Sequence, residues 1–469
     1  MSEQDIKARQ SARYDMMVNQ PLGRVIPKIA VPSIISMMVS MFYNMADTFF
    51  VSKINTAATA AVGINVSLMF IIQAIGMTFA SGCMSYISRL LGMKQQEKAS
   101  RVMATGFFSA FFLNVLFAIG GLIFMDPLMR MLGATESILP YARDYASYIL
   151  IGAPFIGASF VMDSSLRGEG MSKMAMIGVT VGAVLNVGLD PLFIFTFGMG
   201  TGGAALATII SQIIGFCVLI SMYLRKKSIL KLSIKNVTFN WDIYGEILKI
   251  GFPAFLRVAL TSLSTIVLNN VAGAFGDAAI AAMSIHSRVV MFSNSALIGF
   301  GQGYSPVAGF NHGANRPDRV WKSFWFTVTT AVIGTVVVGV IVFIFAPQIM
   351  LMFRDDPDVI SVGVMALKFH SLSMPVQAIN VISNMTFSAL GHGPQAAAMA
   401  FSRQGLFFIP AALILPGMLG ITGVELIPTV ADCCALIITL ILIIPFLIKL
   451  KESVEGMPEI QPEAAVSEV

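Results

Sequence analysis

Apolar stretches of about 20 residues or more recur along this whole chain, and each is long enough to cross a hydrocarbon core of ~30 Å. Only 12% of the 469 residues are charged, against about a quarter in an ordinary soluble protein. So few charges cannot cover the surface of a water-soluble globule of this size. The apolar runs are continuous and do not alternate, which excludes a transmembrane β-barrel. The sequence therefore predicts an all-α polytopic membrane protein.

Twelve membrane-spanning helices account for the apolar stretches. We expect them at residues 27–50, 58–88, 102–125, 143–166, 173–197, 203–224, 244–275, 278–308, 322–346, 361–389, 396–418 and 423–448. An even number of spans places both termini on one side of the membrane. When that side is the cytoplasm, most of the 30 lysines and arginines fall in cytoplasmic segments, as the positive-inside rule requires. The prediction is a multi-pass membrane protein with both termini in the cytoplasm.

The two halves of the chain resemble each other. Glycines and prolines recur at one offset of 221 residues, which pairs Gly82 with Gly303, Gly92 with Gly313, and Pro154 with Pro375. We interpret this as a duplication. Six spans per copy give both copies the same orientation, so the prediction is two six-helix lobes related as parallel repeats. Two such lobes around a central cleft are typical of alternating-access transporters.

The same reading divides the chain into five parts. We expect an N-terminal cytoplasmic tail at 1–23, an N lobe at 24–225, a cytoplasmic linker at 226–243, a C lobe at 244–451 and a disordered acidic tail at 452–469. This division leaves no room for a sizeable soluble domain.

Polar residues inside the spans are the candidates for function. Asn186 and Asp190 lie four residues apart, so their side chains share one helix face. Pro191 removes a backbone donor and frees the carbonyl of Val187, and we expect a hinge there. These oxygens predict either a cation site or a kink whose polar groups satisfy one another. Asp47, near the outer end of the first span, either joins this site or reaches interfacial water.

Four motifs, "NMADTFFVSK", "FPAFL", "NVGLDPLFIF" and "LRGEG", together resemble the multidrug and toxic compound extrusion (MATE) family over roughly residues 20–450. The resemblance implies a cation site in the amino-terminal lobe, as in one prokaryotic branch of the family. The positions that match its coupling residues are Asp47, Asn186, Asp190 and Thr208. Another branch has acidic residues in helices seven and ten. This chain departs from that pattern, because its tenth span has none.

Residues and resemblance together predict a secondary active exporter of amphipathic, mostly cationic drugs or metabolites. Paired carboxylates can exchange a proton, and the same oxygens suit Na⁺, so the coupling ion is either H⁺ or Na⁺. We expect no other cofactor and no metal beyond Na⁺ at the coupling site. The expected partners are small molecules and the lipid bilayer, not nucleic acid, and the protein is expected to be a monomer.

A substrate cavity is expected to combine flexible apolar side chains with charges inside the membrane. Its candidate residues are Met37, Met41, Asp163, Arg257, Arg288 and Asp432. Two alternatives stay open: the methionines face lipid or fill the protein interior, and Asp432 forms an ion pair with an arginine of its own lobe.

The rival function is a lipid-linked oligosaccharide flippase, which needs cationic groups to bind a diphosphate. Arg257, Arg288 and Arg403 cluster in the spans of the second repeat and support this alternative. A membrane enzyme has little support, because the four histidines show no metal-ligand or nucleophile spacing.

Overall fold

The computed structural model describes residues 3–54 and 56–456, and every regular element within these residues is a helix. In chain order the elements are α1 (Glu3–Val18), α2 (Leu22–Ser52), α3 (Thr56–Gly92), α4 (Gln96–Ile123), α5 (Met125–Met131), α6 (Leu139–Gly168), α7 (Ser172–Pro191), η1 (Leu192–Thr196), α8 (Gly200–Leu224), η2 (Ile234–Asn236), α9 (Trp241–Gly273), α10 (Asp277–Gly313), α11 (Pro317–Phe353), α12 (Pro357–Leu390), α13 (Gly393–Phe401), η3 (Ser402–Phe408), α14 (Ile409–Leu419) and α15 (Ile421–Glu455). The stretches η1 and η3 are π-helical, and η2 is a 3₁₀ turn.

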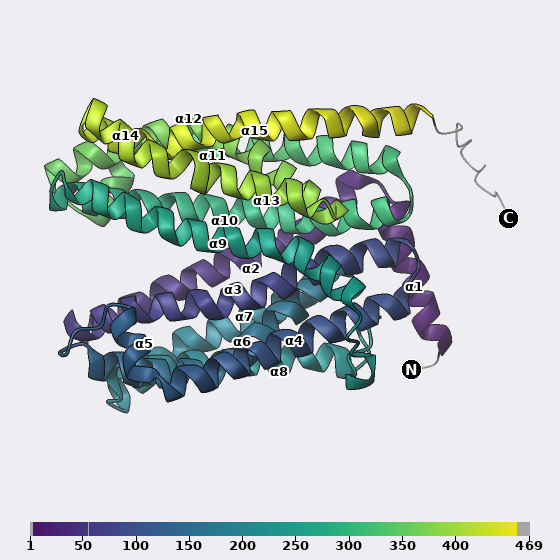
Figure 1. Ribbon diagram of the computed structural model, residues 1–469, viewed down its shortest axis with the longest axis horizontal. Coiled ribbons are helices and arrows are strands. Elements are labelled where there is room, and N and C mark those ends of the chain that lie inside the picture. The colour runs from purple at the N-terminus through teal and green to yellow at the C-terminus, as the bar shows by residue number, and fades with distance from the viewer. Residues whose placement is uncertain (1–2, 55, 457–469) are drawn as a thin grey trace.

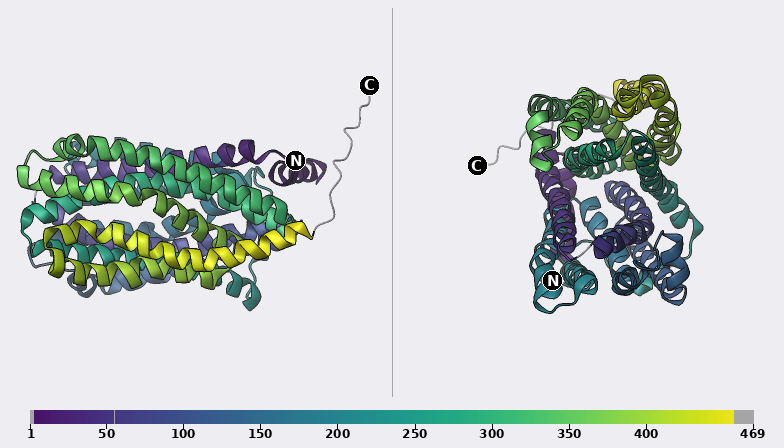
Figure 2. Two further views of the ribbon diagram at one scale, coloured as in Figure 1. Left: turned by 90° about the horizontal axis from the view of Figure 1, so that it is seen from above. Right: turned by 90° about the vertical axis from the view of Figure 1, so that its left-hand side faces the viewer.

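The predicted all-α architecture is confirmed. Within the described residues, eleven helices are long and apolar enough to cross a membrane, counting α7 with η1 and α13 with η3 and α14 as single spans. The eighth predicted span is α10, which has 37 residues and packs against α2 and α12. Helices α2 to α8 form one lobe and α9 to α15 the other (Figure 1). Both lobes are visible end-on in Figure 2.

The ends of the chain differ from the prediction. The helix α15 continues to Glu455, so residues 452–455 are helical and not disordered. The expected tail at 1–23 contains α1 and the first residues of α2. Polar sequence near a terminus still forms a helix here because α1 packs against α3 and α10. The rest of the predicted acidic tail, 457–469, lies outside the described residues.

The two lobes meet along a seam of glycines. Gly92 in α3 faces the backbone carbonyl of Phe310 in α10, and Gly313 in α10 faces the backbone carbonyl of Arg89 in α3. Arg89 and Phe310 are themselves 221 residues apart, so the two contacts are equivalent under the internal repeat. A side chain at either glycine would meet backbone atoms that cannot rotate away. Membrane helices approach this closely only through small residues, which explains why these glycines occur in both repeats.

The seam lies toward the end of the bundle where α1 and the last turn of α15 lie (Figure 1), hereafter the termini end. The largest hydrophobic core joins residues of both lobes, including Ile29 and Leu90 from the first and Ile247 and Phe310 from the second. The three smaller cores each belong to a single lobe. The ribbons of the two lobes separate toward the opposite end, hereafter the far end (Figure 1).

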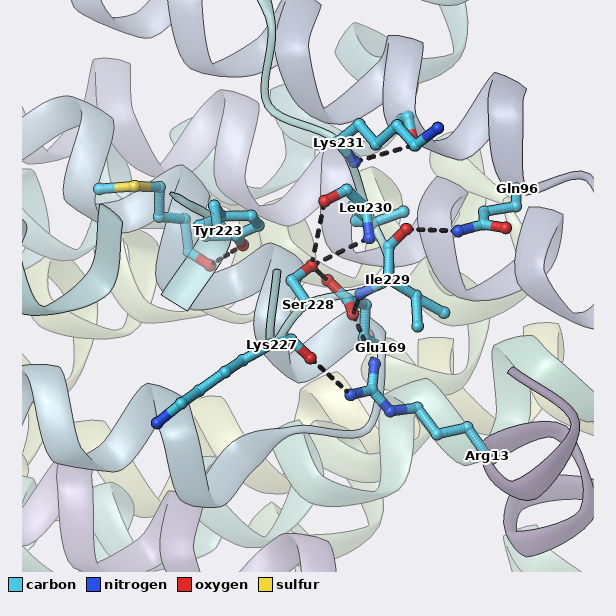
Figure 3. A network of polar contacts seen from close by, with 11 residues as sticks. Arg13, Gln96, Glu169, Tyr223, Lys227, Ser228, Ile229, Leu230 and Lys231 are labelled. Atoms are coloured by element: carbon cyan, nitrogen blue, oxygen red, sulfur yellow. Dashed lines mark hydrogen bonds and ion pairs between the residues drawn. The ribbon is translucent and has the colours of Figure 1, made fainter. Parts of the chain in front are cut away.

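A polar network covers the N lobe at the termini end, around the buried carboxylate of Glu169 between α6 and α7 (Figure 3). Arg13 of α1 donates from Nη1 to Glu169 Oε2 at 2.7 Å and from Nη2 to the Lys227 carbonyl at 3.2 Å. The Ser228 hydroxyl and the Ile229 amide of the interlobe linker also donate to this carboxylate. One buried acid therefore joins α1, the linker and the N lobe.

The segment after Arg13 continues onto the C lobe. Asn311 Nδ2 of α10 donates to the Met17 carbonyl at 3.1 Å, and Arg319 Nη2 of α11 donates to the Gln20 carbonyl at 2.7 Å. Met17 is itself fully buried in the core shared by both lobes. The N-terminal segment thus bridges the lobes where the seam holds them together.

This network predicts that acid stabilises the folded protein. Burial raises the pKa of Glu169, and the Arg13 charge and the donors from Ser228 and Ile229 oppose this effect without cancelling it. An acid with a raised pKa binds more protons in the folded than in the unfolded state, so stability is lost as pH rises through the raised value. In detergent, the melting temperature should therefore rise as the pH is lowered from neutral toward 4.5, the ordinary glutamate pKa.

Glu169→Gln should weaken that pH dependence, because glutamine cannot titrate. Glu97→Gln, which changes an exposed glutamate in the first turn of α4, is the matched control and should keep the wild-type profile. Equal pH profiles of the melting temperature for wild type and Glu169→Gln would contradict a raised pKa of Glu169 as the cause.

Candidate functional site

A cavity of about 140 Å³ lies inside the N lobe, between α2, α3, α6, α7 and α8. One residue of the C lobe, Gln302 of α10, also lines it. Asn186 and Thr208 line the part nearer the far end, whereas Asp163 and Arg167 line the part nearer the termini end. Along α6 the lining runs from Ile156 to Arg167, which spans about 16 Å at the rise of an α-helix. The cavity is therefore elongated along the bundle.

Three of the predicted coupling residues meet at the far part of this cavity. Asn186 Nδ2 donates to Asp190 Oδ1 at 3.1 Å, one turn later in α7, and is 3.3 Å from Thr208 Oγ1 in α8. All three side chains are buried, and that of Asp190 is fully so. The contact within α7 follows from the four-residue spacing. The contact with Thr208 depends on how α7 and α8 pack.

Asp47 approaches the same group from α2, where it lies close enough to Asp190 for their charges to interact. Its Oδ1 atom is buried without a hydrogen-bond partner among the described residues, and so are Asp190 Oδ2 and Asn186 Oδ1. Buried acceptors are normally paired. Three unpaired oxygens from two carboxylates and an amide are suited to hold a proton or a hard cation such as Na⁺.

Three further polar residues adjoin the site and are absent from the sequence-based prediction. Tyr43, one turn before Asp47, and Gln212 of α8 both line the cavity, with their side chains near each other. Tyr145 of α6 lies beside Thr208 and is close enough to feel the charges of both aspartates. The helical spacing of Tyr43 to Asp47, and of Thr208 to Gln212, could have identified two of them. Tyr145 gives no comparable signal, because only tertiary packing brings α6 to the site.

Pro191 ends α7 directly after Asp190, where the hinge is predicted. The backbone then changes to the π-helical stretch η1, Leu192–Thr196. Such stretches frequently occur at functional sites inside helices. The backbone hydrogen-bonding pattern thus changes directly after Pro191, where the hinge is expected. Bending of the helix at this hinge stays a prediction.

The residues predicted for a substrate cavity separate into two groups. Met37 and Asp163 line the N-lobe cavity, where Asp163 forms a two-pronged ion pair with Arg167 at 2.9 and 3.2 Å. Met41 does not line it. Its sulfur lies 3.5 Å from the Ser295 hydroxyl at the contact between α2 and α10. Met41 lies one turn after Met37, but its side chain is on the side of α2 that contacts α10.

Arg257, Arg288 and Asp432 belong to C-lobe helices and do not line the N-lobe cavity either. Asp432 is fully buried and forms an ion pair with Arg403 at 2.5 Å, which is the alternative left open for it. The Arg257 side chain is half-buried and that of Arg288 is exposed. Neither has a side-chain hydrogen bond or ion pair within the described part of the chain.

Comparisons with known proteins agree with this geometry. The family model MatE matches residues 32–192 and 253–414, one segment in each lobe. The multidrug export protein MepA of Staphylococcus saprophyticus is 29% identical over 414 residues, covering 88% of this chain and 91% of that protein. MepA of Staphylococcus aureus is 28% identical over 423 residues, covering 90% and 93%.

Solved structures share the fold. An outward-facing multidrug resistance MATE family transporter of the MOP superfamily superposes with a TM-score of 0.88 at 24% identity, covering 93% of this chain and 98% of that one. A MATE structure in the straight conformation gives a TM-score of 0.88 at 25% identity, covering 94% and 99%. The two-lobe arrangement is therefore the same in all three.

Proposed function

This chain belongs to the MatE family, and from that premise we propose that it is a secondary active multidrug exporter, which moves amphipathic, mostly cationic compounds by antiport of H⁺ or Na⁺ through alternating access. Multidrug export is the activity that the names of its relatives state. The observation that carries the coupling proposal is the group of unpaired oxygens on Asp47, Asn186 and Asp190.

The proposed location is the bacterial plasma membrane, with both termini in the cytoplasm and the protein acting as a monomer. The distribution of lysines and arginines supports this orientation. With the termini end in the cytoplasm, the glycine seam and the segment from Arg13 to Gln20 close the cytoplasmic side. The structure then corresponds to the outward-facing state of the transporter.

The N-lobe cavity supplies the proposed mechanism. Binding of H⁺ or Na⁺ between Asp47 and Asp190 removes negative charge beside the cavity and lowers its affinity for a cationic compound. The bound ion shifts the balance between the inward-facing and outward-facing states only by its difference in affinity for these two states. One charge moving through 100 mV provides ~2.3 kcal/mol, or roughly a 50-fold concentration gradient, which is sufficient for efflux.

The rival flippase function has weaker support. Of the three span arginines that would bind a diphosphate, Arg403 is already neutralised by Asp432. Only Arg257 and Arg288 remain for such a ligand. The proximity of Asp47, Asn186, Asp190 and Thr208 in the N lobe supports cation coupling instead.

The test is ethidium export from proteoliposomes under an imposed proton or sodium gradient, comparing wild type with Asp47→Asn. Export driven by one gradient and lost in the variant would support the antiporter and identify its ion. Asp355→Asn, at an exposed aspartate between α11 and α12, is the control and should export normally. Undiminished export by Asp47→Asn would remove Asp47 from the coupling site. Absence of export under both gradients would favour lipid-linked substrates.

A further inference from the structure

A second buried polar cluster lies in the C lobe, around the carboxylate of Asp432 in α15. This side chain is fully buried, and its Oδ1 atom accepts a hydrogen bond from Arg403 Nε at 2.5 Å. The Oδ2 atom accepts a hydrogen bond from Ser373 Oγ at 3.3 Å and lies 4.0 Å from His370 Nδ1. Asp432 therefore has one cationic partner and, on its other oxygen, an imidazole just beyond hydrogen-bond distance.

His370 is one of two histidines packed together in this cluster. Its ring meets the ring of His286 edge to face, with centroids 5.3 Å apart. The two side chains are only 1% and 2% exposed, and none of their four ring nitrogens has a hydrogen-bond partner in the described residues. A neutral imidazole has one donor and one acceptor, and buried polar groups are nearly always paired. The pair therefore has unused hydrogen-bonding capacity beside a buried carboxylate.

The charged residues on the helices around the two histidines are few, and they include the buried Glu425, two turns before Asp432 on α15, and the half-buried Arg257 on α9. Asp432 faces them from α15 and Arg403 from η3, so the cluster has no net charge while both imidazoles are neutral. Lys368, also on α12, places its ammonium over the Phe343 ring of α11. Arg288, on the histidine-bearing helix α10, is exposed. The membrane-embedded parts of α11, α13 and α14 contain no charged residue.

We propose that this cluster is a proton-binding site of the C lobe, in which His370 and Arg403 are alternative cationic partners of Asp432. With Arg403 in place, the carboxylate has its counter-ion and no proton is needed. When Arg403 moves away, His370 takes one proton from a hydronium ion, which leaves as water, and its Nδ1–H donates to Asp432 Oδ2. One N–H bond forms and one O–H bond of hydronium breaks, and the cluster again has no net charge.

Arg403 is the member of the cluster that is able to move. Its side chain is 25% exposed, whereas the Asp432 side chain is fully buried. It also lies on the π-helical stretch η3, the type of backbone often found at functional sites. A carboxylate left buried without a cation is strongly unfavourable. Departure of Arg403 and uptake of a proton by His370 are therefore linked.

The internal repeat gives the cluster a counterpart. At the 221-residue offset, Asp432 of the last span corresponds to Ser211 of the sixth, and the buried Ser211 lines the N-lobe cavity. Each lobe thus has a buried polar group on the equivalent helix. The C-lobe site is independent of Asp47 and Asp190 and goes beyond the proposed export function.

The chain has only four histidines, so ¹⁵N-histidine NMR of the full-length protein in detergent can report on each one. His312 and His392 lie outside the cluster and show whether a variant remains folded. Between about pH 8 and about pH 6, which brackets the ordinary histidine range, His370 should be neutral in wild type and an imidazolium in R403Q. In R403Q/D432N it should be neutral again, because no buried carboxylate needs a cation.

A neutral His370 in folded R403Q would overturn the proposal. So would an imidazolium in R403Q/D432N, because Asp432 would then not be its cause. If R403Q yields too little folded protein, the lysine variant R403Q/H370K supplies a fixed cation and should restore the yield, whereas R403Q/H370Q should not. Equal yields from these two double variants would also overturn it. None of these measurements requires transport, so their failure leaves the proposed export function standing.

Discussion

Replacement of Gly92 or Gly313 by alanine is expected to hold the two lobes apart at the termini end and to slow export severely. At both positions an added Cβ meets a backbone carbonyl of the other lobe, that of Phe310 or Arg89. Overpacking of this kind costs ~1–3 kcal/mol, which lowers the ratio of closed to open seam by roughly 5- to 150-fold. Because each export cycle passes through both states, the export rate should fall by a similar factor.

Two measurements check this result. Spin labels at Lys98 of α4 and Lys322 of α11, both exposed near the termini end, report the distance between the lobes, which should increase in either alanine variant. Ethidium export from proteoliposomes gives the rate. Gly120→Ala and Gly334→Ala are matched controls, because both glycines are helical and an added Cβ meets nothing within 4 Å. Unchanged distances together with normal export would show that the seam tolerates the extra methyl group.

Features that depend on spacing within one helix are the ones that the sequence predicts well. The twelve spans and two lobes follow from hydropathy and the 221-residue repeat, and both agree with the structure. The contact between Asn186 and Asp190 follows from their spacing on α7. Thr208 and Asp47 lie on other helices, and their place beside this pair came from the family resemblance, because no local rule connects α2, α7 and α8.

Features that depend on packing between helices are the ones that sequence reasoning missed. His286 and His370 are 84 residues apart and show no ligand spacing, yet the contact of α10 with α12 brings their rings together. Met41 fits a cavity pattern by composition, but the helix phase places it against Ser295. The repeated glycines indicate a duplication. Only the structure shows that Gly92 and Gly313 make equivalent contacts across the seam between the lobes.

Asp47→Asn and Asp190→Asn are each expected to lower gradient-driven ethidium export by about a hundredfold, equivalent to ~2.7 kcal/mol. Asparagine keeps the size of the side chain and removes the charge and the exchangeable proton. The double variant should be no slower than either single variant, because two carboxylates that interact directly bind the coupling ion as one unit. The initial rates of all three variants, measured in the same proteoliposome preparation with Asp355→Asn as the control, test this expectation.

The size of the combined effect distinguishes two arrangements of the site. If the aspartates bound separate ions, their losses would multiply, and the double variant would be about ten-thousandfold slower than wild type. Equal losses in single and double variants mean that the ion needs both carboxylates at once. That outcome is the one expected from a site where Asn186 donates to Asp190 and Thr208, leaving one free oxygen on each aspartate for the ion. Multiplying losses would instead show that Asp47 and Asp190 bind separate ions.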